Sequence, residues 1–194
     1  YKNQEHIGSM FKDYNLDQVN KIQVVKQADV VMLLYLLEHK FSKEVKKANY
    51  DYYEKRTLHD SSLSLSTHSI LASDIDEKDL AYKLFQEATK IDLGENMKTS
   101  DHGIHAASLG GLWQIVVNGF GGVRMVGGNL RINPKLPENW SRLSFSFMWK
   151  GNKLDIELTK EGIKIEVKDE MLEEIEILVY DKKYVLNQIL KIKF

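Results

Sequence analysis

Hydrophobic residues recur three to four positions apart in the first half of this chain and two positions apart in the second half. The wider spacing predicts amphipathic helices, because positions three and four apart share one helix face. We expect five helices, with Ser42 as the N-cap of the second and Asp76 as the N-cap of the fourth. The first, second, third and fifth cover residues 16–38, 42–55, 63–72 and 104–118. The fifth is apolar on nearly all sides, so we expect it to be buried, and Gly119 is placed to end it.

Beyond Gly121 the pattern changes to short alternating runs separated by turn dipeptides. Dipeptides such as Gly127-Gly128 are typical of hairpins, because glycine adopts positive φ angles at little steric cost. The runs predict strands over residues 123–126, 130–133, 143–149, 154–158, 163–167, 175–180 and 185–192. Such a series is typical of an antiparallel β-sandwich. The chain is therefore predicted to be an α+β protein, with helices in residues 1–122 and a small antiparallel β-sandwich domain in residues 123–194.

Composition narrows the possible partners. The chain has 194 residues, 43% of them hydrophobic, which suits a globular core. Its 27 basic residues balance 28 acidic ones, so the basic excess of a nucleic-acid-binding protein is missing and we expect no nucleic-acid partner. No apolar stretch approaches the roughly 20 residues of a membrane helix, so we expect no membrane partner. The lack of cysteine excludes disulfides and agrees with a cytoplasmic location. A first residue Tyr1 rather than Met indicates a fragment or a processed product.

Two polar clusters interrupt the helical pattern early in the chain. Lys26-Gln27 lies inside the first predicted helix and supplies donors for sugar hydroxyls or an anion, although such residues more often face solvent. The second cluster follows the second predicted helix and contains His59, Ser61 and Ser62. If one of these serines caps the next helix, the backbone N–H groups at that helix start attract an anion. The alternative for the second cluster is a capped loop without a ligand.

A third polar cluster opens the most apolar helix. His105 and Ser108 are three residues apart, so they can face the same way on a helix. Small residues around them, such as Gly110 and Gly111, allow a ligand or another backbone to approach closely. A tightly packed core helix with a hydrogen-bonded histidine is the alternative.

Other chemistries fit the polar residues less well. The candidates for metal ligands are His59, His68, His102, His105, Asp60 and Asp101. They form no His-Glu-x-x-His pattern, so we rank a metal site below an oxyanion site and assign no metal ligand. The chain also lacks the Gly-x-Ser-x-Gly elbow of a serine hydrolase.

Several longer motifs resemble glycoside hydrolase family 65, which includes phosphorylases of maltose, trehalose and kojibiose and some hydrolases. The resemblance runs in order from about Lys26 to Leu158. The motifs are Lys26-Gln27-Ala28-Asp29-Val30, Tyr52-Tyr53-Glu54-x-Arg56-Thr57-x-His59-Asp60-Ser61-Ser62-Leu63-Ser64, Gly103-Ile104-His105-Ala106-Ala107-Ser108-x-Gly110-Gly111-x-Trp113, Gly119-Phe120-Gly121-Gly122 and Leu136-Pro137-x-x-Trp140.

This resemblance implies a fold and a reaction. The fold is an (α/α)6 barrel followed by a β-sandwich, with this chain supplying the last barrel helices and the sandwich. The reaction is inverting phosphorolysis, in which a carboxylic acid protonates the leaving oxygen and phosphate attacks the opposite face of the sugar. The acid of the family lies upstream of the motif at Lys26. We therefore assign no catalytic residue here and expect this chain alone to be inactive.

The resemblance also assigns binding roles. It places phosphate against the motifs matched by His59, Ser61, Ser62, His105 and Ser108. Lys26 and Gln27 match residues near the sugar. Inorganic phosphate is then a co-substrate, a disaccharide is the other partner, no cofactor is needed, and the complete enzyme is a candidate homodimer. We predict that residues 56–64 and 103–108 lie side by side.

Two other functions stay open on the sequence. A hydrolase of the same family would use water in place of phosphate. A carbohydrate-binding or structural module would use Trp140 and Trp149 to stack on sugar, although aromatic residues at such positions are more often core.

Overall fold

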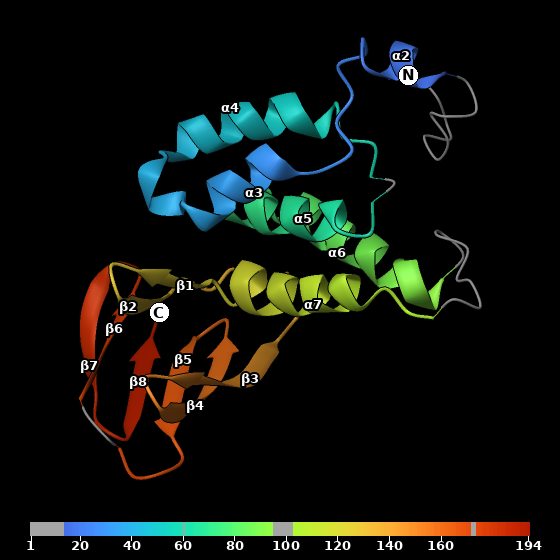
Figure 1. Ribbon diagram of the computed structural model, residues 1–194. Coiled ribbons are helices and arrows are strands. Elements are labelled where there is room, and N and C mark those ends of the chain that lie inside the picture. The colour runs from blue at the N-terminus through green and yellow to red at the C-terminus, as the bar shows by residue number, and fades with distance from the viewer. Residues whose placement is uncertain (1–13, 60, 95–102, 172–173) are drawn as a thin grey trace. The chain divides into compact units, whose positions relative to one another are not determined.

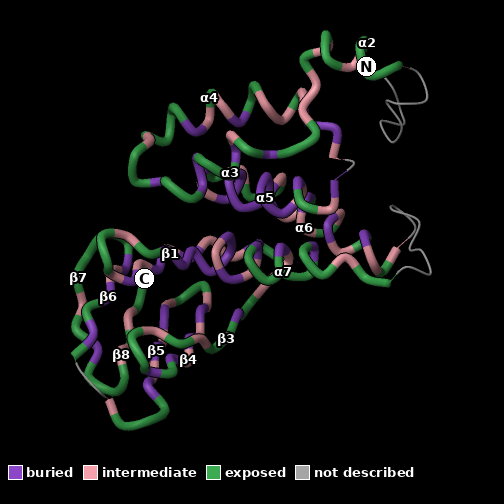
Figure 2. Tube along the Cα trace, in the orientation of Figure 1, coloured by how far each residue is buried: buried purple, intermediate pink, exposed green. Residues whose placement is uncertain are grey.

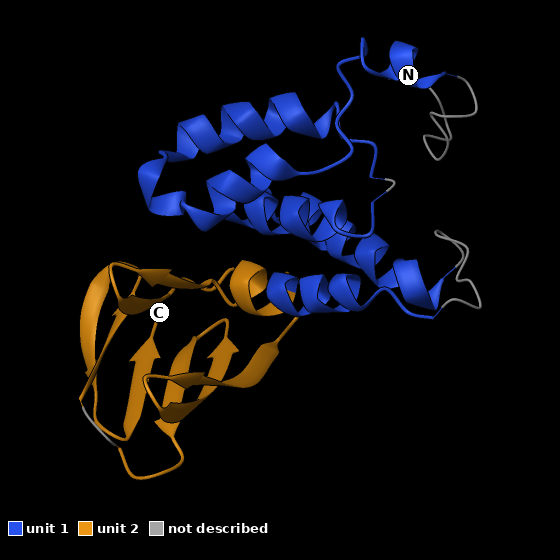
Figure 3. Ribbon diagram, viewed as in Figure 1, with its two compact units in different colours: residues 1–115 blue, residues 116–194 orange. Residues whose placement is uncertain are grey.

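The computed structural model describes residues 14–59, 61–94, 103–171 and 174–194. The chain divides into two compact units, residues 1–115 and residues 116–194 (Figure 3). Within the described ranges, no helix combines the length and the apolar character needed to cross a membrane.

The first unit is helical, and its longer helices alternate in direction (Figure 1). The helices are α2 (Leu16–Val19), α3 (Asp29–Leu36), η1 (Glu38–Lys40), α4 (Lys43–Glu54), α5 (Ser64–Asp74), α6 (Lys78–Leu93) and α7 (Ala106–Gln114). Figure 1 shows α3, α5 and α7 running one way and α4 and α6 running back between them. The starts of α3, α5 and α7 therefore lie at the same end of the unit.

Helix α5 is the centre of this unit. It contacts α3, α4, α6 and α7, and Figure 2 shows it buried along almost its whole length. Its small polar residues permit this close packing because their hydroxyls are satisfied by backbone carbonyls. Ser66 donates to the carbonyl of Leu63 at 2.9 Å, and Ser69 donates to that of Ala81 at 2.8 Å.

The predicted helix over residues 16–38 is wrong as a continuous element. Residues 20–28 are not helical, because Val25 pairs instead with the segment after α4. The N–H of Val25 donates to the carbonyl of Arg56 at 2.9 Å, and the N–H of Leu58 donates to Val25 at 3.1 Å. The pair Lys26-Gln27 accordingly lies in the extended stretch before α3 rather than within a helix.

One predicted helix cap is confirmed and another is wrong. Ser42 does cap α4, since its side chain accepts the N–H of Val45. Asp76 does not cap α6: it adopts a left-handed backbone with φ 65°, and Glu77 occupies the N-cap position.

Helix α7 differs from the prediction of burial on all sides. Among its residues Ser108 and Gly111 are buried, whereas Leu109 and Trp113 are 42% and 53% exposed. In the described part of this chain α7 packs on α5 and α6, so its opposite face is uncovered. The helix continues into a π-helical turn, η2 (Ile115–Phe120).

The second unit contains two four-stranded sheets. One has the order β1-β2-β6-β7, formed by β1 (Val123–Val126), β2 (Asn129–Ile132), β6 (Ile175–Val179) and β7 (Lys182–Leu186). The other has the order β3-β4-β5-β8, formed by β3 (Arg142–Trp149), β4 (Asn152–Thr159), β5 (Gly162–Val167) and β8 (Ile189–Lys193). Alternate residues of β4, β5 and β6 are buried, as in a sandwich whose inner faces form the core.

The α+β class with a C-terminal β-sandwich is confirmed, with two differences in the strands. The predicted strand over residues 185–192 is two strands in different sheets, because Gln188 adopts φ 59° and interrupts the extended backbone between them. The pairing of β2 with β6 is parallel, while the other pairings between these strands are antiparallel. Gly122 is required at the start of this unit, since a Cβ atom there would lie 1.8 Å from the carbonyl oxygen of Asn133.

Candidate functional site at the starts of helices α3, α5 and α7

The first two polar clusters meet in space. Pairing of Val25 with Thr57 brings the segment before α3 against the segment before α5. The hydroxyl of Ser61 donates to the side-chain oxygen of Gln27 at 3.4 Å. A cavity of about 100 Å³ adjoins this contact. It is lined by Val25, Gln27, Ala28, Asp29, Val30, Val31, Tyr53 and Thr57.

The third cluster is tied to the second through the packing of α5 on α7. A Cβ atom added to Gly111 would lie 2.6 Å from the hydroxyl oxygen of Ser66, so the backbone of α7 touches the first turn of α5. Because α5 and α7 run the same way (Figure 1), the loops that lead into them end at the same side of the unit. The adjacency of residues 56–64 and 103–108 stays a prediction that this helix arrangement favours.

The starts of these three helices are not capped by their own N-cap side chains. The N-cap positions are Ala28 for α3, Leu63 for α5 and His105 for α7, and none makes a side-chain cap hydrogen bond. Ser61 was expected to be a possible cap, and its hydroxyl instead accepts the N–H of Leu63 at 3.3 Å. At α7 the N–H groups of Ala106 and Ser108 already donate to the carbonyls of Ile104 and His105. Helix starts whose N-cap side chains make no cap bond still attract anions through the first-turn N–H groups that are not used in this way.

His59 sits in a strained and well-defined position before α5. Its backbone is left-handed with φ 53°, which a side chain seldom adopts without surrounding support. Its ring supplies that support: Nδ1 lies 3.1 Å from the hydroxyl of Ser64, and Nε2 lies 3.4 Å from a carboxylate oxygen of Glu54. Both ring nitrogens are thus committed to the protein in this structure.

Glu54 joins His59 to a second, fully buried histidine. Its other carboxylate oxygen accepts a hydrogen bond from Nδ1 of His68, a side chain with no exposed surface. Burial alone would raise the pKa of Glu54, but the hydrogen bonds from His59 and His68 outweigh that effect and lower the pKa to about 2. The carboxylate is therefore ionised at neutral pH and holds both rings.

His68 completes this cluster from inside α5. Burial lowers the pKa of His68, opposed by its hydrogen bond to Glu54 and by the charge of that carboxylate, so we assign a neutral ring at neutral pH. Its Nε2 lies 3.4 Å from the hydroxyl of Thr57. The ligand atoms of Glu54, His59 and His68 fall within 4.8 Å of one another, as metal ligands do. Their mutual hydrogen bonds account for the cluster without an ion, so we keep the assignment of no metal ligand as a prediction.

His105 is held by a carboxylate in the same way but in more open surroundings. Asp92, in the last turn of α6, lies 2.7 Å from Nδ1 of His105 through Oδ1. The backbone N–H of His105 donates to the same carboxylate. The side chain of Asp92 is 9% exposed and that of His105 is 35% exposed, so this imidazole can meet a ligand.

The remaining predicted site residues differ in accessibility. Lys26 and Gln27 are exposed, and Ser62 is half-buried. Ser61 and Ser108 are buried, with 8% and 2% of their surfaces exposed. Asp60, Asp101 and His102 lie outside the described residues.

Three residues that build this site were not assigned a role from the sequence: Glu54, His68 and Asp92. Glu54 lies in the longest motif of the resemblance, and His68 was considered only as a metal ligand. Asp92 carried no signal, because thirteen residues separate it from His105 and nothing in the local pattern links them. One feature could have identified Glu54 and Asp92. Each is a carboxylate in the last turn of a helix, followed by a loop that contains a histidine.

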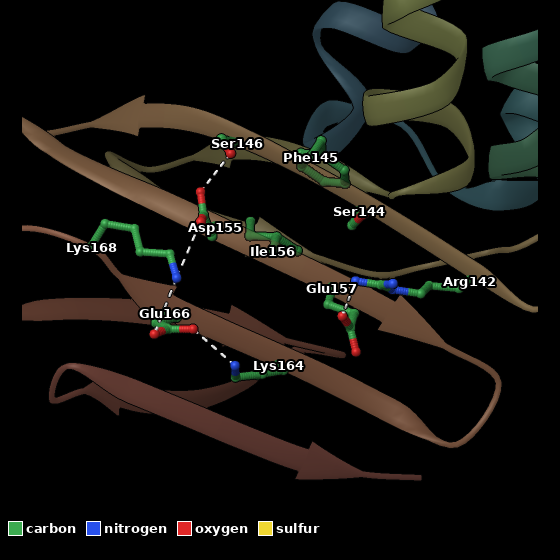
Figure 4. Close-up of a pocket in the computed structure, with 10 residues that line it drawn as sticks. All are labelled: Arg142, Ser144, Phe145, Ser146, Asp155, Ile156, Glu157, Lys164, Glu166 and Lys168. Atoms are coloured by element: carbon green, nitrogen blue, oxygen red, sulfur yellow. Dashed lines mark hydrogen bonds and ion pairs between the residues drawn. The ribbon is translucent and has the colours of Figure 1, made fainter.

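A larger cavity, of about 360 Å³, lies on the outward face of β3, β4 and β5 (Figure 4). Its charged side chains pair with one another, as Lys164 does with Glu166 at 2.8 Å. Further pairs join Lys168 to Asp155 and to Glu166. The positive and negative side chains on this face neutralise one another in ion pairs. The face therefore has fewer unpaired donors for an anionic ligand than the helix starts have.

The tryptophans of the second unit resemble core residues. Trp140 and Trp149 are both half-buried. The ring of Trp140 packs edge-on against Phe120 with centroids 5.3 Å apart. Such packing favours the core interpretation over a sugar-stacking surface.

The chain has helices of alternating direction, with polar side chains at one end, followed by a β-sandwich. We expect these features of a carbohydrate-active enzyme of the family that the motifs resemble. Two family models confirm this expectation. Residues 1–114 match the central catalytic domain of glycosyl hydrolase family 65, and residues 123–186 match the C-terminal domain of that family. The chain belongs to glycosyl hydrolase family 65.

Relatives of known activity are similar across most of this chain. The kojibiose phosphorylase of Halothermothrix orenii is 46% identical over 184 residues, which cover 93% of this chain and 24% of that protein. The α,α-trehalose phosphorylase of Thermoanaerobacter brockii is 44% identical, over 88% of this chain and 22% of that protein. A solved structure, a putative kojibiose phosphorylase from the human microbiome, superposes with a TM-score of 0.88 at 35% identity, over 96% of this chain and 27% of that one. The chain thus spans about a quarter of the length of these relatives.

Proposed function

We propose that this chain is the phosphate-binding and C-terminal part of an α-glucoside phosphorylase. The substrate of the complete enzyme is a disaccharide such as kojibiose, trehalose or maltose, and inorganic phosphate is its co-substrate. Relatives named as kojibiose and trehalose phosphorylases support this reaction class. We further propose that the complete enzyme contains an (α/α)6 barrel, of which α3 to α7 are the last helices, and acts in the cytoplasm.

One observation carries the proposal: the starts of α3, α5 and α7 share one end of the helical unit and lack side-chain caps. Phosphate is a dianion with several acceptor oxygens, so it gains from N–H groups, hydroxyls and imidazoles that converge. The groups we assign to it are His59, Ser61, Ser62, His105 and Ser108. Lys26 and Gln27 are assigned to the sugar, and the contact of Gln27 with Ser61 supports the proposal that these two sets adjoin.

In the proposed reaction a phosphate oxygen attacks the anomeric carbon from the face opposite the leaving sugar. The carbon–oxygen bond to that sugar breaks, and a carboxylic acid protonates the departing oxygen. The products are a β-configured sugar 1-phosphate and the released sugar. The role of this chain is to bind and orient the phosphate, because charge developing during transfer is best stabilised by donors already in place.

His105→Ala in the complete enzyme tests the proposal. Loss of a charge-assisted hydrogen bond to phosphate should reduce kcat/KM for phosphate about 10- to 100-fold, while a sugar inhibitor binds as before. His39→Ala is the matched control, because His39 is an exposed histidine of η1, between α3 and α4 at the other end of the helices. A hydrolase would show a mild effect of His105→Ala that does not depend on phosphate, and that result would refute the phosphorylase assignment.

The isolated chain should show no phosphorolysis or hydrolysis of maltose, trehalose or kojibiose. The reason is that the proton donor for the leaving sugar is proposed to lie in the rest of the enzyme. The measurement is release of glucose 1-phosphate and glucose from each disaccharide in the presence of phosphate. Turnover that stays with the chain through purification would disprove this part of the proposal.

A further inference from the structure

Asp92 makes an unusual set of contacts for a carboxylate at the end of a helix. It lies in the last turn of α6, and it accepts two different donors from one residue on the next helix. Its Oδ1 lies 3.1 Å from the backbone nitrogen of His105 and 2.7 Å from the ring nitrogen Nδ1, and its Oδ2 lies 3.3 Å from the same backbone nitrogen. The carboxylate therefore fixes both the position of this N-cap residue and the orientation of its ring.

These contacts also fix which ring nitrogen carries the hydrogen. An ionised carboxylate only accepts hydrogen bonds, so Nδ1 of His105 must be the donor to Asp92. The hydrogen bond from His105 lowers the pKa of Asp92, which keeps the carboxylate ionised at neutral pH. Among the described residues no hydrogen bond of Nε2 is seen, so Nε2 is the nitrogen offered to a ligand, and it donates to a phosphate oxygen when the ring is protonated.

We propose that Asp92 is the positioning residue for the phosphate-binding histidine His105, holding Nδ1–H and the start of α7 so that Nε2 faces the phosphate. Asp92 does not touch phosphate itself. This inference rests on the proposed function, since it assigns a role within the same phosphate site.

Burial separates this role from that of a surface ion pair. The side chain of Asp92 is 9% exposed, while the imidazole that it holds is 35% exposed. The acceptor is thus sheltered and the ring is open on another side, which is the arrangement that a second residue needs to orient a ligand-binding histidine. By contrast, Glu87 of the same helix pairs with Lys90 at 2.7 Å, and both of those side chains are more than a third exposed.

The test compares four variants of the complete enzyme: Asp92→Asn, His105→Ala, the double variant and Glu87→Gln as the matched control. Asp92→Asn keeps the shape of the side chain and an oxygen acceptor, but it loses the charge and also presents an N–H to the ring. We expect kcat/KM for phosphate to fall about tenfold or more, by analogy with residues that orient metal-binding histidines. The KM for the disaccharide should change less than twofold, and Glu87→Gln should match the wild type.

The double variant distinguishes positioning from a purely structural role. If Asp92 acts through His105, adding Asp92→Asn to His105→Ala should cause no further loss of phosphate use. A conservative Asp92→Glu variant, which retains the charge, should recover part of the activity lost in Asp92→Asn. Melting temperatures of all variants show whether a loss comes from unfolding, and phosphate titrations are compared only among variants that remain folded at the assay temperature.

The outcomes separate failure of this inference from failure of the proposed function. If His105→Ala weakens phosphate use and Asp92→Asn does not, Asp92 is only a tether for the loop and the inference is wrong. Additive losses in the double variant would overturn it as well. If His105→Ala itself leaves phosphate use unchanged, the proposed phosphate site is wrong, whatever Asp92 does.

Discussion

At two loop–helix junctions of this chain a carboxylate holds a histidine, but the two junctions differ in how the histidine is left. Before α5, Glu54 at the end of α4 holds His59; before α7, Asp92 at the end of α6 holds His105. In the first junction the carboxylate also binds the buried His68, and both nitrogens of His59 are committed. In the second junction one carboxylate serves one histidine, and the ring keeps an open side.

We infer from this difference that the cluster around Glu54 stabilises the fold, whereas the pair of Asp92 and His105 serves ligand binding. An interlocked cluster with a fully buried member resists change, because removing one partner leaves another buried polar group unsatisfied. In the single pair of the second junction the carboxylate is sheltered but the imidazole is 35% exposed, so this ring can meet an incoming anion. We therefore expect mutations of Glu54 and His68 to act mainly on stability, and mutations of Asp92 and His105 to act mainly on the proposed use of phosphate.

The largest expected effect on stability is that of Glu54→Ala. It leaves Nδ1 of His68 without its acceptor inside the helical unit, which should lower the free energy of unfolding by about 2 to 3 kcal/mol. Asp92→Ala should cause a clearly smaller loss, because His105 can turn to water. Chemical denaturation of both variants measures the comparison. Equal losses of unfolding free energy in the two variants would show that the two carboxylates contribute to stability in the same way.

Acid should expose the same difference. The pKa of Glu54 is lowered from 4.5 to about 2, so the unfolded chain binds more protons than the folded chain between these values. Its stabilising contribution is present above about pH 4.5 and is lost as the pH falls toward 2. Since the pKa of His68 is also lowered by burial, further stability is lost as the pH falls below its ordinary value of 6.5.

Glu54→Gln should therefore flatten the acid side of the stability profile by about 2 kcal/mol. The measurement is the unfolding free energy or melting temperature of wild type and variant at several pH values between about 2 and 8, the range over which both groups titrate. A variant whose profile runs parallel to that of the wild type would contradict the assignment of Glu54 as an ionised framework residue.

The smallest effects are expected where α7 packs on the first turn of α5. Gly111→Ala would place a Cβ atom 2.6 Å from the hydroxyl of Ser66, which should cost about 1 to 2 kcal/mol through displacement of α7 from α5. Gly110→Ala is the matched control, because no atom lies within 4 Å of its added Cβ. That change should be neutral or stabilise the helix by up to about 1 kcal/mol. Similar destabilisation by both would mean that the close approach of Gly111 to Ser66 does not determine the packing of α5 on α7.

The sequence predicted the helices and strands better than it predicted which distant segments and side chains contact one another. Glycine-containing turns correctly marked the change from helices to strands, because those turns depend on local backbone preferences. The break at residues 20–28 was missed, since it depends on pairing of Val25 with Thr57 rather than on local spacing. Residues such as His105 stood out by type, but their carboxylate partners became visible only when distant helix ends were brought together.

The parallel contact between β2 and β6 has a consequence for how the chain acquires its structure. In order of synthesis, β3, β4 and β5 follow one another and can pair as they emerge, whereas β2 must wait for β6. During that interval the edge of β2 is open to incorrect partners, and contacts between distant segments form slowly. Interrupting translation before Ile175 should therefore leave a nascent chain prone to aggregation, with one sheet nearly made and the other held as an unfinished hairpin.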